Sequence, residues 1–166
     1  MIGPDPIDLC SGHGTHVAGI IAADARNANA SQPFIGVAPG LSIRAYRVFG
    51  CQGSAASDVI VAAMVQAFTD GVSIISLSLG ETGGWSETGE DVIASRISAM
   101  GVFMSIAAGN DGAQGLFDAS SPASGNGVTS VASVDNIANV AYSARTSMNQ
   151  TIVHSYPWFR KLGVGD

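Results

Sequence analysis

Short apolar runs alternate with longer segments of helical spacing along most of the chain. Branched and aromatic residues dominate residues 42–49, which predicts a strand, and the alanine-rich segment 57–68 that follows predicts a helix. The same order then returns, with four more elements expected: a strand over 72–79, a helix over 87–100, a strand over 102–107 and a strand over 128–134. This alternation predicts an α/β fold.

Continuous apolar runs of this kind are typical of parallel strands that are covered on both faces of a sheet. The βαβ units of such a sheet place their ligand sites beyond the carboxyl ends of the strands. We therefore expect the chemistry of this protein in the glycine-containing loops that begin at residues 50, 80 and 109.

The last thirty residues differ from the rest of the chain. Beyond residue 136 the alternation of strands and helices is lost, and residues 156–161 form an aromatic and basic stretch. A chain of 166 residues has the length of one ordinary domain. We expect one partial domain over residues 1–136 and a divergent, poorly specified tail over residues 137–166.

The composition excludes several classes of function. Apolar residues make up 46% of the chain and charged residues 12%, so a packed core is expected rather than disorder. The formal net charge of −6 argues against a nucleic-acid partner, because phosphate binding needs a basic surface. No apolar run reaches the roughly 18 residues that a membrane span requires, so no membrane partner is expected. Residues 1–6 lack the basic start and apolar core of a secretory signal peptide.

The segment 11–23 carries the most informative chemistry. His13 lies between Gly12 and Gly14 at the start of an apolar, alanine-rich run that predicts a helix. A histidine on the first turn projects from the end of a rigid element, and flanking glycines allow a substrate backbone to approach closely. This arrangement suits a general base. The alternative is a structural role, in which His13 only caps the helix and His16 is a buried polar residue.

Two other functions compete for the same segment. His13 and His16 are three residues apart, which could suit zinc, but no Cys, Glu or third His stands nearby at ligand spacing. The glycines of this segment also imitate a dinucleotide-binding loop, and such a loop must follow a buried strand. Residues 4–10 do not read as a strand, so both a zinc site and a nucleotide-dependent oxidoreductase are disfavoured.

Two motifs stand out along the chain: Gly-His-Gly-Thr-His-Val-Ala-Gly over residues 12–19 and Ala-Ala-Gly-Asn-Asp-Gly over residues 107–112. The first resembles the histidine motif of the subtilisin-like serine proteases, and the second resembles the oxyanion-asparagine motif of the same family. Three segments between them are similar to the family's strands and loops: residues 36–40, 47–50 and 76–80. The resemblance covers about residues 8–136 and extends in detail to secreted fungal members. It implies a three-layer parallel sheet with helices on both faces, here incomplete.

The resemblance also implies the roles of individual residues. His13 would be the general base of a Ser/His/Asp mechanism, and Asn110 would donate a hydrogen bond to the developing oxyanion. Two loops would hold an extended polypeptide substrate between them: Ser78, Leu79 and Gly80 on one side, and Gln52, Gly53 and Ser54 on the other. Without the two motifs, both loops would read as ordinary βα turns.

Two members of the catalytic triad are not identified. Asp5 and Asp8 have no preceding apolar strand to hold them behind a histidine, so neither is assigned as the acid. Thr146, Ser147 and Met148 imitate the middle of the nucleophile motif, but an arginine replaces the glycine before them and no proline follows. We therefore interpret Ser147 as a decoy.

The expected function is that of a fragment of a serine endopeptidase that is inactive by itself. The alternative is a non-catalytic peptide-binding or interaction module on the same fold. The resemblance places Cys10 and Cys51 in neighbouring loops and implies a disulfide and an extracellular location, although two buried free thiols remain an alternative. Some family members bind calcium, but no acidic cluster with ligand spacing stands out here, so no metal site and no cofactor are assigned.

Overall fold

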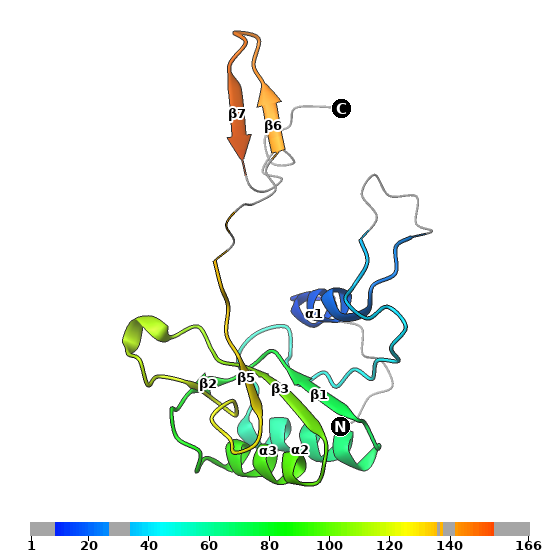
Figure 1. The fold of residues 1–166 in the computed structure, drawn as a ribbon, viewed down its shortest axis with the longest axis vertical. Coiled ribbons are helices and arrows are strands. Elements are labelled where there is room, and N and C mark those ends of the chain that lie inside the picture. The colour runs from blue at the N-terminus through cyan, green and yellow to red at the C-terminus, as the bar shows by residue number, and fades with distance from the viewer. Residues whose placement is uncertain (1–8, 27–33, 136, 138–141, 155–166) are drawn as a thin grey trace. The chain divides into compact units, whose positions relative to one another are not determined.

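A computed structural model describes residues 9–26, 34–135, 137 and 142–154, and the chain divides into two units, residues 1–132 and 133–166 (Figure 1). The first unit contains three helices: α1 (His13–Ala22), α2 (Ser57–Thr69) and α3 (Gly89–Ala99). Its strands are β1 (Ile74–Leu77), β2 (Glu81–Thr82), β3 (Phe103–Ala107), β4 (Ser120–Ser121) and β5 (Thr129–Val131), with a 3₁₀ turn, η1 (Gly112–Gln114), between β3 and β4.

The centre of the first unit is a parallel sheet in the order β1-β3-β5. Helices α2 and α3 lie side by side along one face of this sheet (Figure 1). Most of the buried apolar residues come from both helices and from the two longer strands: Ile60, Met64, Ala67, Ile75, Ala94, Ile97, Met104 and Ile106. The fold is therefore the predicted α/β fold in its incomplete three-layer form.

Side chains alternate between the two faces of the sheet, as strand geometry requires. Ile75 and Met104, which are paired in register, are buried on the face that α2 and α3 cover. Their neighbours Ile74 and Phe103, also paired, point to the opposite face and are 56% and 53% exposed. In the described part of the chain, the large apolar side chains of Ile74 and Phe103 on this second face therefore remain exposed.

Helix α3 begins with a set of interactions that its sequence explains. Thr88 is the N-cap, and its hydroxyl accepts a hydrogen bond from the backbone N–H of Asp91 at 3.3 Å. Glu90 and Asp91 stand in the first turn, where acidic groups interact favourably with the helix dipole, and Arg96 stands in the last turn. The helix ends at Ala99, and its C-cap Met100 is followed by Gly101 at a positive φ of 95°.

Helix α1 is fixed at its carboxyl end by a tight backbone contact. The N–H groups of Gly36 and Val37 donate to the carbonyls of Ala23 and Ile20, at 2.8 and 3.0 Å. A Cβ atom at position 36 would lie 2.6 Å from the backbone nitrogen of Ala22. Only glycine fits at this point. Because Gly36 has no side chain, the backbone around it can pass close to the end of α1.

The strand predicted over residues 42–49 is absent from the structure, and that prediction was wrong. A strand needs a backbone ladder with a neighbour, whereas this segment is held by its side chains. Tyr46 and Val48 pack against the core, and Arg44 and Tyr46 bond to Asp70 at the end of α2. The segment therefore lies against the molecule without joining the sheet.

The second unit contains an antiparallel hairpin, β6 (Tyr142–Arg145) and β7 (Thr151–His154). This hairpin lies in the part of the chain that was expected to be a divergent, poorly specified tail, and its strands were not predicted from the sequence. The turn between them is closed by a hydrogen bond from the N–H of Thr146 to the carbonyl of Gln150 at 2.9 Å. The boundary predicted at residue 136 stays a prediction.

Candidate active site

Asn110 follows the carboxyl end of β3, in the position expected for a ligand-binding residue of a parallel sheet. The N–H of Ala108 donates to the carbonyl of Val131 at 2.9 Å, which extends the pairing of β3 with β5. Gly109 then turns the chain at a φ of 99°, a conformation that favours glycine. The side chain of Asn110 is exposed directly after this turn, so its amide is available to a ligand.

The loop of Ser78, Leu79 and Gly80 follows the carboxyl end of β1, the strand next to β3. Leu79 packs against the core, while Ser78 and Gly80 are exposed. Gly80 and Gly109 approach the same residue, Ser120. A Cβ atom at Gly109 would lie 2.9 Å from the Cβ of Ser120, and one at Gly80 would overlap the Ser120 hydroxyl. The structure therefore brings the two predicted loops together on β4.

His13 is the first residue of α1 and is exposed. Gly12 precedes it with a φ of 73°, so glycine is again required at the turn into the helix. Three residues before His13, Cys10 forms the predicted disulfide with Cys51, with a Cα–Cα distance of 5.0 Å. Arg47 Nη2 also donates to the sulfur of Cys10 at 3.8 Å. The start of α1 is thus tied covalently to the loop that begins at Cys51.

The loop of Gln52, Gly53 and Ser54 begins immediately after this disulfide. All three residues are exposed, and Gly53 has a φ of 85°. The disulfide brings this loop to the beginning of the helix that carries His13. Neither the side chain of His13 nor that of Asn110 forms a hydrogen bond or ion pair in the described part of the chain. Their convergence on one substrate carbonyl therefore stays a prediction.

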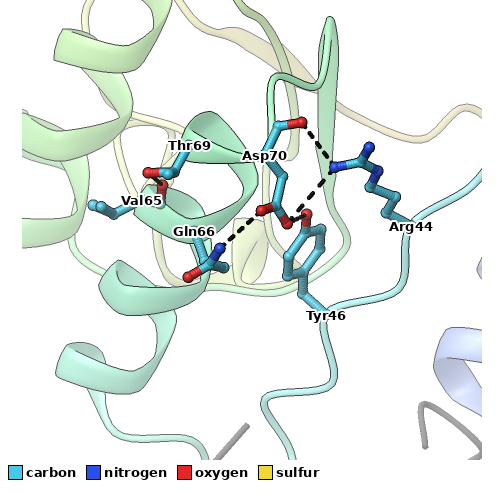
Figure 2. A network of polar contacts seen from close by, with 6 residues as sticks. All are labelled: Arg44, Tyr46, Val65, Gln66, Thr69 and Asp70. Atoms are coloured by element: carbon cyan, nitrogen blue, oxygen red, sulfur yellow. Dashed lines mark hydrogen bonds and ion pairs between the residues drawn. The ribbon is translucent and has the colours of Figure 1, made fainter. Parts of the chain in front are cut away.

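A network around Asp70 anchors the segment that leads to Cys51 (Figure 2). The carboxylate of Asp70 accepts from the hydroxyl of Tyr46 at 2.6 Å and from the amide of Gln66 at 2.8 Å. Arg44 Nη1 donates to the Asp70 carbonyl at 2.7 Å and lies 3.8 Å from its carboxylate. The hydrogen bonds from Tyr46 and Gln66 lower the pKa of Asp70. Loss of water contact on burial, followed by the bond to Asp70, raises the pKa of Tyr46.

Sequence analysis missed a buried polar cluster beside the two loops. Asp91 and Ser121 are completely buried, and the Ser121 hydroxyl donates to Asp91 Oδ2 at 2.7 Å. Burial raises the pKa of Glu90, while hydrogen bonds from Ser57 and Ser121 act in the opposite direction. Strand β4, which contains Ser121, has only two residues, so no periodic pattern announces it. The sequence does show glycines at positions 80 and 109. These glycines indicate that another part of the chain, here Ser120, packs closely against both loops.

Of the residues weighed as acid and nucleophile, Ser147 alone lies within the described residues. Asp5 and Asp8 lie outside the described residues. Ser147 is exposed in the turn between β6 and β7, in front of Asn149 at a φ of 60°, and not at the start of a helix. A nucleophilic serine needs a neighbouring base and a fixed geometry. The interpretation of Ser147 as a decoy stays a prediction, and the position of Ser147 in an exposed turn supports it.

The described residues contain no group of three or more His, Cys, Asp or Glu residues that could hold a metal ion. None of their helices has the length and hydrophobicity needed to cross a bilayer.

The sequence is similar to those of known proteins. The model of the subtilase family, a family of S8 peptidases, matches residues 3–161, which includes most of the segment predicted to be divergent. A thermostable alkaline protease from Halalkalibacterium halodurans is 38% identical over 125 residues, or 75% of this chain and 32% of the relative. Subtilisin-like protease 7 from Arthroderma gypseum is 33% identical over 135 residues, or 77% of this chain and 30% of the relative.

A third relative has a name that states where it is found. The minor extracellular protease Vpr from Bacillus subtilis is 38% identical over 78 residues, which are 47% of this chain and 9% of the relative. The chain thus spans about a third or less of the length of these three relatives.

Proposed function

Because this chain belongs to the subtilase family, we propose that it carries part of the active site of a serine endopeptidase that hydrolyses polypeptides by a Ser/His/Asp mechanism. His13 would take the proton from an attacking serine and return it to the leaving amine. Asn110 would donate its side-chain N–H to the oxyanion. In subtilisin itself, removal of such a donor lowers kcat by about 10²–10³.

One observation carries this proposal. The exposed amide of Asn110 and the loop of Ser78 to Gly80 stand at the carboxyl ends of two adjacent parallel strands, and both loops pack on Ser120. An extended peptide bound along residues 78–80 by backbone hydrogen bonds would run past Asn110. The exposed loop of Gln52 to Ser54 would form the other edge of the binding site.

A peptide titration tests the site directly. We expect an acetylated and amidated alanine tetrapeptide to shift the NMR signals of Gly53, Gly80, Gly109 and the Asn110 side chain in the isotope-labelled chain. Signals from the hairpin residues 142–154 serve as the internal control and should not move. Shifts confined to the hairpin, or no shifts at millimolar peptide, would remove the support for a substrate site at these loops.

The chain alone should not hydrolyse peptides. Neither an acid motif nor a nucleophile motif is identified among its 166 residues. In subtilisin, loss of the serine lowers kcat by about 10⁶. Purified chain incubated with a fluorogenic peptide should therefore release no product above the buffer rate. Hydrolysis that disappears in Ser147→Ala would show that Ser147 is a nucleophile and that this expectation is wrong.

The alternative function is a peptide-binding module without catalysis. It would be favoured if the full-length gene product bound the tetrapeptide at the same loops but also failed to hydrolyse it. In that case His13→Ala would leave peptide affinity unchanged and abolish no reaction. In an endopeptidase, the same substitution in the full-length product abolishes turnover.

We infer that the protein acts outside the cytosol. A disulfide such as Cys10–Cys51 persists in oxidising compartments and is rare in cytosolic proteins. The printed name of one relative, the minor extracellular protease Vpr, agrees with this location. The location is tested by fractionating the source cells and probing the fractions with an antibody to the chain.

A further inference from the structure

Asp91 is a buried acid that the proposed reaction does not use. Its relative exposure is 0%, and it stands in the first turn of α3. Oδ2 accepts hydrogen bonds from the hydroxyls of Thr88, at 2.5 Å, and Ser121, at 2.7 Å. Oδ1 is buried with no hydrogen-bond partner. A buried carboxyl with one unpaired oxygen lowers the stability of the folded state. Thr88 already caps the helix, so capping does not explain an acid at position 91.

The oxygens of the two hydroxyls that donate to Asp91 are also in contact with each other. Thr88 Oγ1 and Ser121 Oγ are 2.8 Å apart, which makes a compact set of three polar side chains. Thr88 is the N-cap of α3 and Asp91 is in its first turn, whereas Ser121 lies 30 residues after Asp91, in β4. The set therefore fixes β4 against the start of α3, and we call it the Asp91 clamp.

Strand β4 holds the loop of Ser78 to Gly80 from one side. It pairs with β2 in antiparallel register, Glu81 with Ser121 and Thr82 with Ser120. Strand β2 begins directly after Gly80. A Cβ atom at Gly80 would lie 2.5 Å from the carbonyl oxygen of Ser121. A displacement of β4 would therefore move the loop that is proposed to pair with substrate.

The same strand holds the oxyanion loop from the other side. The N–H of Ser120 donates to the carbonyl of Ala108 at 3.1 Å, two residues before Asn110. The side chain of Ser120 fills the space beside Gly109. Strand β4 thus contacts the glycines of both loops.

We propose that Asp91 is a positioning residue, which acts through Ser121 and β4 to set the spacing between the peptide-binding loop and Asn110. This inference rests on the proposed function of the two loops. An oxyanion donor works only at hydrogen-bond distance from the reacting carbonyl, so the spacing between Asn110 and the loop that holds the peptide determines whether both act on one substrate.

The test compares substitutions at the clamp in the isotope-labelled chain. Asp91→Ala should shift the amide signals of Gly80 and Gly109 and the side-chain signal of Asn110, and should weaken tetrapeptide binding on the order of tenfold. Asp91→Asn retains an acceptor oxygen for the two hydroxyls and should restore the positions of these signals. Signals in α2, away from the clamp, should stay in place in both variants.

Asp70→Ala is the matched control, because it removes another acid from a side-chain network that does not include β4. It should leave the signals of Gly80, Gly109 and Asn110 unchanged. If Asp91→Ala does not fold, Ser121→Ala removes the same link to β4 with a smaller change and should give the same loop shifts.

Several results would overturn the positioning role. Unchanged loop signals in folded Asp91→Ala or Ser121→Ala would contradict it, as would equal shifts in Asp70→Ala or failure of Asp91→Asn to restore the signals. The proposed function can fail separately. The unsubstituted chain could bind no peptide while the NMR signals of the two loops still shift on loss of Asp91. In that case Asp91 positions the loops, but their proposed role in peptide binding is wrong.

Discussion

Glu90 and Asp91 stand next to each other in the first turn of α3, but their surroundings differ. Asp91 accepts two hydroxyl hydrogen bonds at one oxygen, whereas burial dominates the environment of Glu90 and raises its pKa above the ordinary value of 4.5. Nearby Glu81 and Asp91 add repulsion in the same direction. Glu90 is thus held in a place that disfavours its charged form.

The raised pKa of Glu90 should make the protein less stable as pH rises. The unfolded chain loses the Glu90 proton near pH 4.5, while the folded chain retains it to higher pH, so the unfolding free energy falls over this interval. Each pKa unit corresponds to about 1.4 kcal/mol. In Glu90→Gln this fall should disappear, as measured by urea unfolding from pH 4 to 7.

Glu87→Gln is the control for the effect of Glu90, because Glu87 is an exposed acid just before the same helix. It should retain the pH slope of the unsubstituted protein. An identical slope in Glu90→Gln would show that Glu90 is not the group responsible.

At the residue scale, sequence analysis found the groups that belong to motifs and missed those that support them. Asn110 and His13 lie in continuous, recognisable segments at the ends of predicted elements. Asp91 and Ser121 are far apart in the chain and meet only in the fold, so no local spacing reveals their contact.

At the scale of secondary structure, long apolar runs were reliable and short polar strands were not. The predicted elements over 57–68, 72–79, 87–100 and 102–107 correspond to α2, β1, α3 and β3, because their burial repeats with a helical or strand period. The run over 42–49 has strand-like composition, but side-chain bonds rather than a backbone ladder hold it. Composition cannot distinguish these two ways of holding an extended segment.

The Asp70 network is therefore expected to stabilise the attachment of residues 42–49 to α2. Tyr46→Phe removes the donor to Asp70 Oδ2 and should lower the unfolding free energy at pH 7, measured by urea denaturation. Because the pKa of Asp70 is lowered, its contribution is present above about pH 4 and is lost as pH falls through the lowered value.

The difference between Tyr46→Phe and the unsubstituted protein should accordingly shrink in acid. Thr69→Val, which removes a neighbouring hydroxyl that bonds within α2, is the control for loss of a hydroxyl in this region. A Tyr46→Phe effect that does not change with pH would show that the bond to Asp70 is not its source.

At the scale of the whole molecule, the disulfide links the predicted base to the rest of the first unit. It joins residues 41 positions apart, and a cross-link over a loop of this length stabilises the folded state by about 4 kcal/mol in the chain-entropy model. Cys10→Ser with Cys51→Ser should lower the thermal midpoint of the chain in calorimetry. Titration of denatured, unreduced protein should find no free thiol, and two reactive thiols would refute the bridge.

The same cross-link has a consequence for proteolytic damage. A single cut anywhere between Cys10 and Cys51 would leave two pieces joined through sulfur. Such nicked molecules would migrate as intact protein on an electrophoresis gel run without reductant and would separate into fragments only after dithiothreitol is added. The histidine would thus remain attached to the body of the molecule after backbone scission.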